Sequence, residues 1–314
     1  MSRIASVHLG GKHVGHVVLV PFGAQHMLSE PVEARVRVGR AVDHAVGLGA
    51  SVVGLAALTA QVTGGGVSLR SRTDVAVTNG NALTAAIVHD QVRDLIHGSP
   101  SGRVAIVGAT GSVGSTVAKL VARSRHADEI LLVAGNERRL DSLRCNLSGR
   151  GVVIRSTTDV HAIRSADLVV LLTPAAGSVL ESQHLAESAV VLDATQPRNT
   201  STDPARERRD VRFLDGGIVS IPSLEIRGGN VGLPNGRAYA CFAETALLAL
   251  SGQRQHFSIG MPDLDQVDHV RSLASEYAHL GFGVAAPTSF GVPVRGPSRI
   301  ATAGQAAEQI DEQV

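Results

Sequence analysis

The stretch VAIVGATGSVG at Val104–Gly114 constrains the fold more than any other part of this chain. Its first four residues are apolar, which is typical of a buried parallel strand. Gly108, Gly111 and Gly114 then follow at three-residue spacing, and Ser115–Arg125 carries apolar residues on one helical face. Glycines let a backbone approach a pyrophosphate, and a helix N-terminus supplies free N–H groups. The pattern predicts a dinucleotide site; the alternative is a flavodoxin-like glycine turn that binds nothing.

The segments around this turn alternate between strand-like and helix-like patterns. Strands are expected at 103–108, 129–134, 152–155, 167–172, 189–193 and 211–214, and helices at 112–125, 136–147 and 158–164. This alternation predicts an α/β fold in which residues 101–221 form a doubly wound parallel sheet of the Rossmann type.

The length of the chain leaves room for a second domain, since 314 residues suggest about two domains. We expect residues 1–100, completed by 222–284, to form a second α/β domain that binds the substrate or acyl group. Within it, patterns predict a hairpin over 4–20, helices over 31–46 and 82–96, and a buried helix at Arg237–Leu250. Residues 285–314 contain three prolines and a polar end, so we expect a mobile tail.

Composition excludes several classes of protein. Apolar residues make up 44%, aromatic residues only 3%, and the net charge is +1, so nucleic-acid binding is not expected. The most apolar stretch, Ala45–Val62, is interrupted by glycine and serine, so we expect no integral membrane segment. Cys145 and Cys241 lie far apart and indicate no disulfide scaffold. A cytoplasmic protein, with homo-oligomer formation left open, fits these features.

The end of the second expected strand indicates which cofactor binds. NAD enzymes place an acidic residue there to hold the ribose hydroxyls, whereas this chain has Gly135-Asn136, with Glu137 falling in the following helix. Arg138 and Arg139 follow, and an arginine there can pair with a 2′-phosphate, which favours NADPH over NADH. The alternative for both arginines is an ordinary exposed helix turn. The residues expected to bind the cofactor are Gly108, Thr110, Gly111, Ser112, Val113, Gly114, Asn136, Arg139, Thr173, Gly216 and Gly217.

Several familiar catalytic sites are absent from the sequence. Neither tyrosine, Tyr239 or Tyr277, has a lysine four residues later, and no G-x-S-x-G or H-E-x-x-H occurs. His13 and His16 lie in an expected strand and should face opposite sides, so they make a poor metal site. No metal is expected.

Cys241 is the candidate nucleophile because it lies near the start of the expected helix Arg237–Leu250. A helix N-terminus lowers the pKa of a thiol, and a thiolate can take over the acyl group of a thioester, which hydride then reduces. The alternative is that Cys241 is a small buried apolar residue. Cys145 is expected to be structural.

Several short motifs resemble the long-chain acyl-acyl-carrier-protein reductases of cyanobacteria. In chain order they are TNGNALT at 78–84, GATGSVG at 108–114, QPRN at 196–199, FLDGGIV at 213–219, ACFAETALL at 240–248, HFSIG at 256–260 and HLGF at 279–282. The resemblance implies reduction of acyl-ACP or acyl-CoA to an aldehyde with NADPH, through an acyl-cysteine on Cys241. An acyl carrier protein is then a possible partner.

The chain also departs from this family. Gly135 replaces an arginine at the end of the second strand, while Arg139 is kept, and Leu83 and Ala86 stand where the family has a histidine and a tyrosine. A long fatty chain is therefore not a firm expectation. Two alternatives stay open: a reductase of the shikimate or glutamyl-tRNA type, with Lys12 as its available lysine, and a protein that binds NADPH without turnover.

Overall fold

The computed structural model describes residues 2–97, 102–173 and 180–294 of the chain. Two compact units are present, each made of two chain segments. One contains residues 1–87 and 217–285, and the other contains 88–216 and 286–314. We call them the Cys241 unit and the sheet unit.

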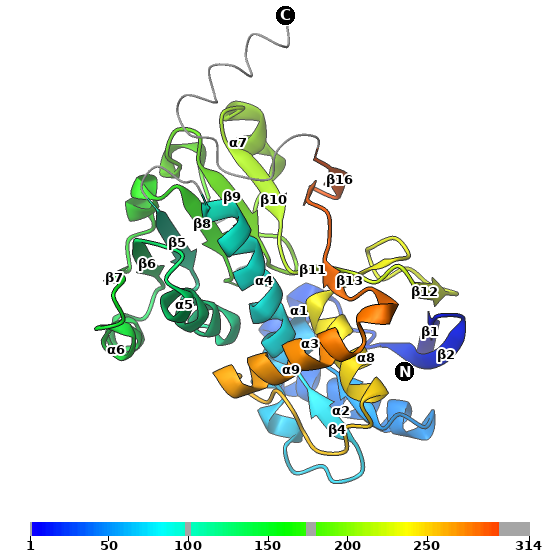
Figure 1. The fold of residues 1–314 in the computed structure, drawn as a ribbon. Coiled ribbons are helices and arrows are strands. Elements are labelled where there is room, and N and C mark those ends of the chain that lie inside the picture. Colours follow the sequence, from blue (N-terminus) through cyan, green and yellow to red (C-terminus); the bar gives the residue numbers. More distant parts are fainter. Residues whose placement is uncertain (1, 98–101, 174–179, 295–314) are drawn as a thin grey trace, which may run out of the picture. The chain divides into compact units, whose positions relative to one another are not determined.

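The sheet unit holds the expected doubly wound sheet (Figure 1). Its six strands are all parallel and lie in the order β10-β9-β8-β5-β6-β7. In chain order they are β5 Arg103–Val107, β6 Glu129–Val133, β7 Val153–Thr157, β8 Leu168–Leu171, β9 Val190–Asp193 and β10 Arg212–Asp215. From β5 the chain adds β6 and β7 on one side of the sheet. It then returns to β8 on the other side of β5 and adds β9 and β10 there. This reversal defines a Rossmann fold and leaves a crevice at the carboxyl ends of β5 and β8.

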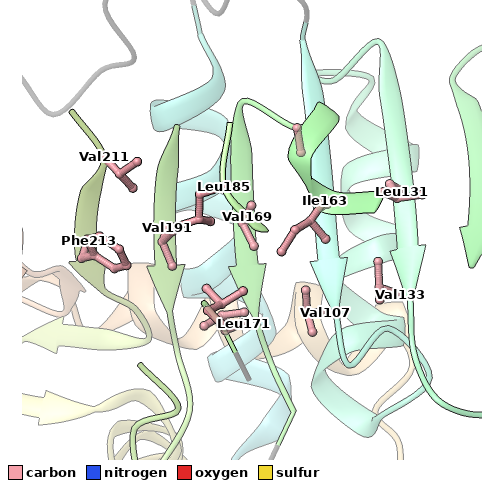
Figure 2. Close-up of a cluster of buried hydrophobic side chains, with 13 residues drawn as sticks. Val107, Leu131, Val133, Ile163, Val169, Leu171, Leu185, Val191, Val211 and Phe213 are labelled. Carbon is pink, nitrogen blue, oxygen red and sulfur yellow. The ribbon is translucent and has the colours of Figure 1, made fainter. Parts of the chain in front are cut away.

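Helices connect these strands. They are α5 Ser112–Ser124, α6 Glu137–Leu147 and α7 Thr202–Glu207, with short 3-10 turns η2 Val160–Ser165 and η3 Ser182–His184. The helix expected at 158–164 is therefore a 3-10 turn. Apolar side chains from the strands meet those of the η2 and η3 segments in one buried cluster (Figure 2), including Val107, Val169, Leu171, Ile163 and Leu185.

The Cys241 unit is built from small sheets and helices. The antiparallel sheet β12-β1-β2 contains β1 Ser2–Leu9, β2 Lys12–Leu19 and β12 Leu224–Arg227, and the expected hairpin is its β1–β2 part. A parallel pair joins β3 Val52–Gly54 to β4 Ala76–Thr78, and a third sheet, β13-β11-β14, contains β13 Arg237–Tyr239, β11 Ile218–Ser220 and β14 Gly283–Val284. The helices are α1 Ala24–Ser29, α2 Pro31–Gly47, α3 Leu58–Val62, α8 Ala240–Leu250 and α9 Leu264–Glu276, with the 3-10 turns η1 Val67–Leu69 and η4 Ala278–Leu280.

Several boundaries differ from the sequence-based expectation, and one of them lies at 216/217 instead of 221/222. The division between the units falls inside α4 Asn81–Ile96, not at residue 100, because one helix continues through both units. Residues 287–294 were expected in a mobile tail but form a hairpin of β15 Thr288–Ser289 and β16 Val292–Pro293. The buried carboxylate of Asp215 accepts hydrogen bonds from Thr288, Phe290 and Gly291, which fixes this hairpin on the sheet unit. The rest of the expected tail, 295–314, lies outside the described residues.

The hairpin also corrects the prediction for His13 and His16. Their rings lie together, with centroids 4.6 Å apart, although residues three apart in a regular strand face opposite sides. The β1–β2 register shifts between Val7 and His8, and such a bulge turns the following side chains to the other face. Within the described residues, no group of three or more His, Cys, Asp or Glu side chains could hold a metal ion. None of the described helices combines the length and apolar composition needed to cross a bilayer.

Candidate active site

A cavity of about 400 Å³ lies at the carboxyl ends of β5, β6 and β8 in the sheet unit. Its lining includes the glycine turn after β5, the end of β6 and the residues after β7 and β8. The lining residues are Val107, Gly108, Thr110, Gly111, Val133, Ala134, Gly135, Arg139, Thr158, Val160, Leu172 and Thr173. Five of the predicted cofactor residues are thus brought together: Gly108, Thr110, Gly111, Arg139 and Thr173.

The three glycines of the turn have three different roles. Gly108 has φ +86°, a conformation that side chains disfavour. A Cβ at Gly111 would lie 3.2 Å from the Gly108 carbonyl oxygen, at the cavity wall, so a side chain there would enter the cavity. A Cβ at Gly114 would come within 2.2 Å of the same oxygen, so the start of α5 packs directly against the turn. This cradle fits a dinucleotide pyrophosphate.

The far side of the cavity is shaped by α6. The Asn136 side chain accepts a hydrogen bond from the backbone N–H of Arg139 at 3.0 Å, which caps this helix. The guanidinium of Arg139 donates to the Thr110 carbonyl oxygen at 3.0 Å, beside the glycine turn. Arg139 is the one charged residue among the described residues that line the cavity, and no carboxylate is among them.

The other predicted cofactor residues lie outside this lining. Ser112 and Val113 form the first turn of α5 beside Gly114. Gly216 packs against Ala194, where a Cβ would lie 2.7 Å from the alanine Cβ. Gly217 has φ +69°, and its carbonyl oxygen accepts a hydrogen bond from the N–H of Ala240. These two glycines thus have structural roles at the end of β10 and at the start of α8.

In the Cys241 unit, α8 begins at Ala240 and not at Arg237 as expected, because β13 (Arg237–Tyr239) pairs with β11. Cys241 is therefore the second residue of α8, nearer to the free N–H groups than the sequence indicated. Backbone N–H groups of Phe242, Cys241 and Ala57 favour the ionised thiol. Ala57, which precedes α3, has φ +48° and ψ −128°, an unfavourable conformation for a residue with a side chain.

The pKa of the Cys241 thiol is nevertheless raised, to about 11. Burial is the largest cause, and the negative charge of Glu244, one helical turn later, is the second. The expectation of a lowered pKa at the helix N-terminus is therefore wrong, because burial and Glu244 outweigh the N–H groups. Cys241 remains partly exposed, whereas Cys145 is exposed on α6.

Glu244 is completely buried. Its carboxylate binds hydrogen-bond donors at the end of β4 and in the first turn of α4. Its carboxylate accepts hydrogen bonds from the Thr78 hydroxyl and, at 2.7 Å, from the backbone N–H of Leu83. The backbone N–H groups of Ala82 and Gly80 also favour its ionised form. Burial nevertheless raises the pKa of Glu244 to about 7. Glu244 was not among the residues expected from the sequence, although one acid in a largely apolar helix was the signal.

The turn at Thr78–Asn81 contacts the other segments of this site. The Asn79 side chain donates to the carbonyl oxygens of Gly65 and Gly260, at 3.0 and 2.9 Å, and accepts from the Ser258 hydroxyl at 2.8 Å. Gly80 lies directly against Cys241, since a Cβ at this glycine would be 2.3 Å from the cysteine Cα. The TNGN and ACFAE motifs therefore meet where Gly80 lies against Cys241, and the HFSIG motif joins the same turn through Asn79, 181 residues before Gly260.

One comparison with known protein families finds a match that lies inside the sheet unit. Residues 103–202 match the family model described as "Semialdehyde dehydrogenase, NAD binding domain". Together with the fold, this match supports a nicotinamide dinucleotide cofactor and an oxidoreductase.

Two curated relatives match more of the chain. Aminotransferase PigE of Serratia sp. is 28% identical over 280 residues, which are 86% of this chain and 33% of that protein. Long-chain acyl-[acyl-carrier-protein] reductase of Synechococcus elongatus is 30% identical over 192 residues, 58% of this chain and 54% of that protein. The chain thus spans about a third and about half of these two relatives.

Solved structures are more distant. The pyrroline-2-carboxylate reductase of Thermococcus litoralis has 14% identity and a TM-score of 0.35, covering 65% of this chain and 67% of that one. The nucleotide-binding domain of glutamyl-tRNA reductase from Thermoplasma volcanium has 16% identity and a TM-score of 0.31, covering 41% of this chain and 84% of that one. Similarity at this level identifies no family.

Proposed function

We propose that this protein reduces an acyl thioester to an aldehyde with NADPH, and that Cys241 carries the acyl group. The observation that carries the proposal is the Thr78–Asn81 turn, which packs against the partly exposed Cys241 through Gly80 and binds the HFSIG motif through Asn79. The relative named as an acyl-carrier-protein reductase supports the substrate class. The acyl carrier is an acyl carrier protein or coenzyme A.

The acyl transfer is a thioester exchange at Cys241. The sulfur attacks the acyl carbon, the bond from that carbon to the carrier sulfur breaks, and the thiol proton ends on the released carrier thiol. The nicotinamide cofactor, when bound, supplies the hydride that the acyl carbon receives. The bond to Cys241 then breaks, the aldehyde leaves, and the cysteine sulfur recovers a proton.

Backbone N–H groups near the thiol have a defined task in this exchange. Those of Ala57 and Phe242 stabilise negative charge on the sulfur. They are also suitable donors to the oxygen that becomes negative when the carbonyl is attacked. Because these donors belong to the backbone, they need no reorganisation during the reaction.

In this proposal, Arg139 determines the preference for NADPH over NADH. It is the charged residue among the described cavity-lining residues, and Gly135 stands where an acidic residue would hold ribose hydroxyls. A guanidinium in that position pairs well with a 2′-phosphate.

Intact-mass spectrometry tests the proposed function directly. The protein is mixed, without cofactor, with medium- and long-chain acyl-CoA and with the same acyl groups on an acyl carrier protein. We expect one added acyl mass in the unmodified protein and in Cys145→Ala, and none in Cys241→Ala. Acylation of Cys241→Ala to the same extent, or no acylation of the unmodified protein by any of these thioesters, contradicts the proposal.

A further inference from the structure

We propose that Glu244 accepts the thiol proton of Cys241 during acyl transfer and returns it to the departing thiol. The inference rests on the proposed function and adds a residue that the reaction requires. It starts from a buried carboxyl group that the acyl-cysteine chemistry otherwise leaves without a task.

The thiol needs a proton acceptor. At neutral pH a thiol with a pKa of about 11 is protonated in nearly all molecules. A protonated thiol is a poor nucleophile. The proton must therefore pass to a neighbouring group while the new carbon–sulfur bond forms.

Glu244 is placed to receive it. The two residues are three positions apart in α8, so their side chains extend from the same face of the helix. Both pack against one residue of the Thr78–Asn81 turn. Gly80 lies against the cysteine Cα, and its N–H favours the ionised carboxylate of Glu244.

The proton affinity of Glu244 suits a group that both accepts and returns a proton. Hydrogen bonds from Thr78 and Leu83 favour its ionised form, burial opposes it, and the resulting pKa is about 7. A group with a pKa near the working pH is ionised often enough to act as a base and protonated easily enough to act as an acid.

Other titratable groups occur on only some of the elements packed against α8. Strands β3, β4 and β11 and the first turn of α4 contain no titratable side chain. The elements that do contain such side chains are β13, with Arg237 and Tyr239, and α9, with Asp265, Asp268, His269, Arg271 and Glu276. The experiment therefore compares variants at Glu244 itself and at its donor Thr78, so that an effect of these other groups is distinguishable.

The test measures two reactions of Cys241 in a Cys145→Ala background, where Cys241 is the remaining thiol. One is acylation by an acyl-CoA, and the other is alkylation by iodoacetamide, in which no carrier thiol has to be protonated. In Glu244→Gln we expect acylation at pH 7.5 to slow by about a hundredfold, the scale of general acid–base catalysis. Alkylation should slow far less, because iodide leaves without a proton and because removing the carboxylate charge lowers the pKa of the thiol, which offsets the loss of the base.

The difference between the two effects separates the proposed role from the alternatives. A purely structural role of Glu244 predicts that both reactions slow to the same extent, and a purely electrostatic role predicts that both become faster. Either result overturns the proposal. If the unmodified protein is not acylated at all while iodoacetamide still reacts with Cys241, the proposed function fails and this inference fails with it.

A pH profile and a second variant cover the case in which Glu244→Gln does not fold. The acylation rate of the unmodified protein should rise with pH to a step near 7, where Glu244 ionises, and the step should be absent in Glu244→Gln. Thr78→Val removes a hydrogen bond that lowers the pKa of Glu244, so the step should move to higher pH. An unmoved step in Thr78→Val, or an unchanged profile in a folded Glu244→Gln, refutes the role.

Discussion

The Cα of Gly80 lies against the backbone of Cys241, leaving no room for a side chain between the turn and α8. A Cβ at Gly80 would be 2.3 Å from both the Cα and the Cβ of Cys241, and Gly80 has φ +75°. This contact brings the start of α8 onto the turn that also binds Glu244, and the arrangement around Cys241 depends on it.

Gly80→Ala should therefore destabilise the protein strongly. Both the overlap and the left-handed φ oppose a methyl group, and we expect a loss of about 3 kcal/mol or more in the free energy of unfolding. Urea unfolding measures this loss. Gly39→Ala is the matched control, since Gly39 lies inside α2 with nothing within 4 Å of its Cβ position. It should stabilise the protein by about 0.5–1 kcal/mol. Equal effects of the two variants would contradict the described contact.

Arg139→Ala should remove most of the preference for NADPH over NADH. The guanidinium lines the cavity, and loss of a charge-assisted contact with a 2′-phosphate costs about 1–2 kcal/mol, or roughly 5- to 30-fold in affinity. Fluorescence titration with both cofactors measures the change, with Arg138→Ala as the neighbouring control. Equal or tighter binding of NADH to the unmodified protein would show that the NADPH assignment is wrong.

Gly111→Val should abolish cofactor binding without unfolding the protein. A Cβ at Gly111 meets only the carbonyl oxygens of Gly108 and Leu172, at 3.2 and 4.0 Å, so the branched side chain extends into the cavity. Calorimetric titration with NADPH, together with thermal unfolding, tests the two parts of this prediction. Retained affinity in a folded Gly111→Val protein would place the cofactor elsewhere.

Cys241→Ala and Cys241→Ser should keep NADPH binding and lose aldehyde formation. Because covalent capture makes hydride transfer intramolecular, we expect the turnover number to fall by at least about a hundredfold. Aldehyde is measured by gas chromatography after incubation with acyl thioester and NADPH, and Cys145→Ala should remain active. Near-normal turnover by Cys241→Ala would favour hydride transfer to a thioester held without a covalent bond.

The stability of the protein should depend on Glu244 between pH 4.5 and 7. Burial raises its pKa from 4.5 to about 7, so folding favours the protonated form. The contribution is fully present below the unfolded pKa and is lost as the pH rises through the folded pKa, by an amount on the order of 3 kcal/mol. Denaturant unfolding at pH 5, 6, 7 and 8 should show this decline in the unmodified protein. If the decline persists unchanged in Glu244→Gln, another group causes it.

Local patterns were sufficient to predict the parallel sheet. The strands β5, β6, β8 and β9 each contain an apolar run of three or four residues, and the glycine turn after β5 specifies both a sharp bend and a helix start. Such signals act between neighbours in sequence. The parallel sheet, its strand order and the position of the cavity follow from them together with the handedness of βαβ connections.

The Cys241 site was only partly predictable from the sequence. ACFAE pointed to Cys241, but the start of α8 at Ala240 depends on the pairing of Ala238 with Val219 in β11. The hairpin at Thr288 similarly depends on hydrogen bonds to Asp215, 73 residues earlier. Helical and strand patterns contain no information about such distant partners.

The sequence by itself determined the Rossmann sheet, its glycine turn and the candidate nucleophile, because each depends on residues close together in the chain. Only the tertiary structure decided the ionisation of the site. A helix N-terminus alone lowers the pKa of a thiol, but burial and the charge of Glu244 reverse that effect at Cys241. Desolvation depends on everything that surrounds a group in space, and those neighbours come from segments that the sequence keeps far apart.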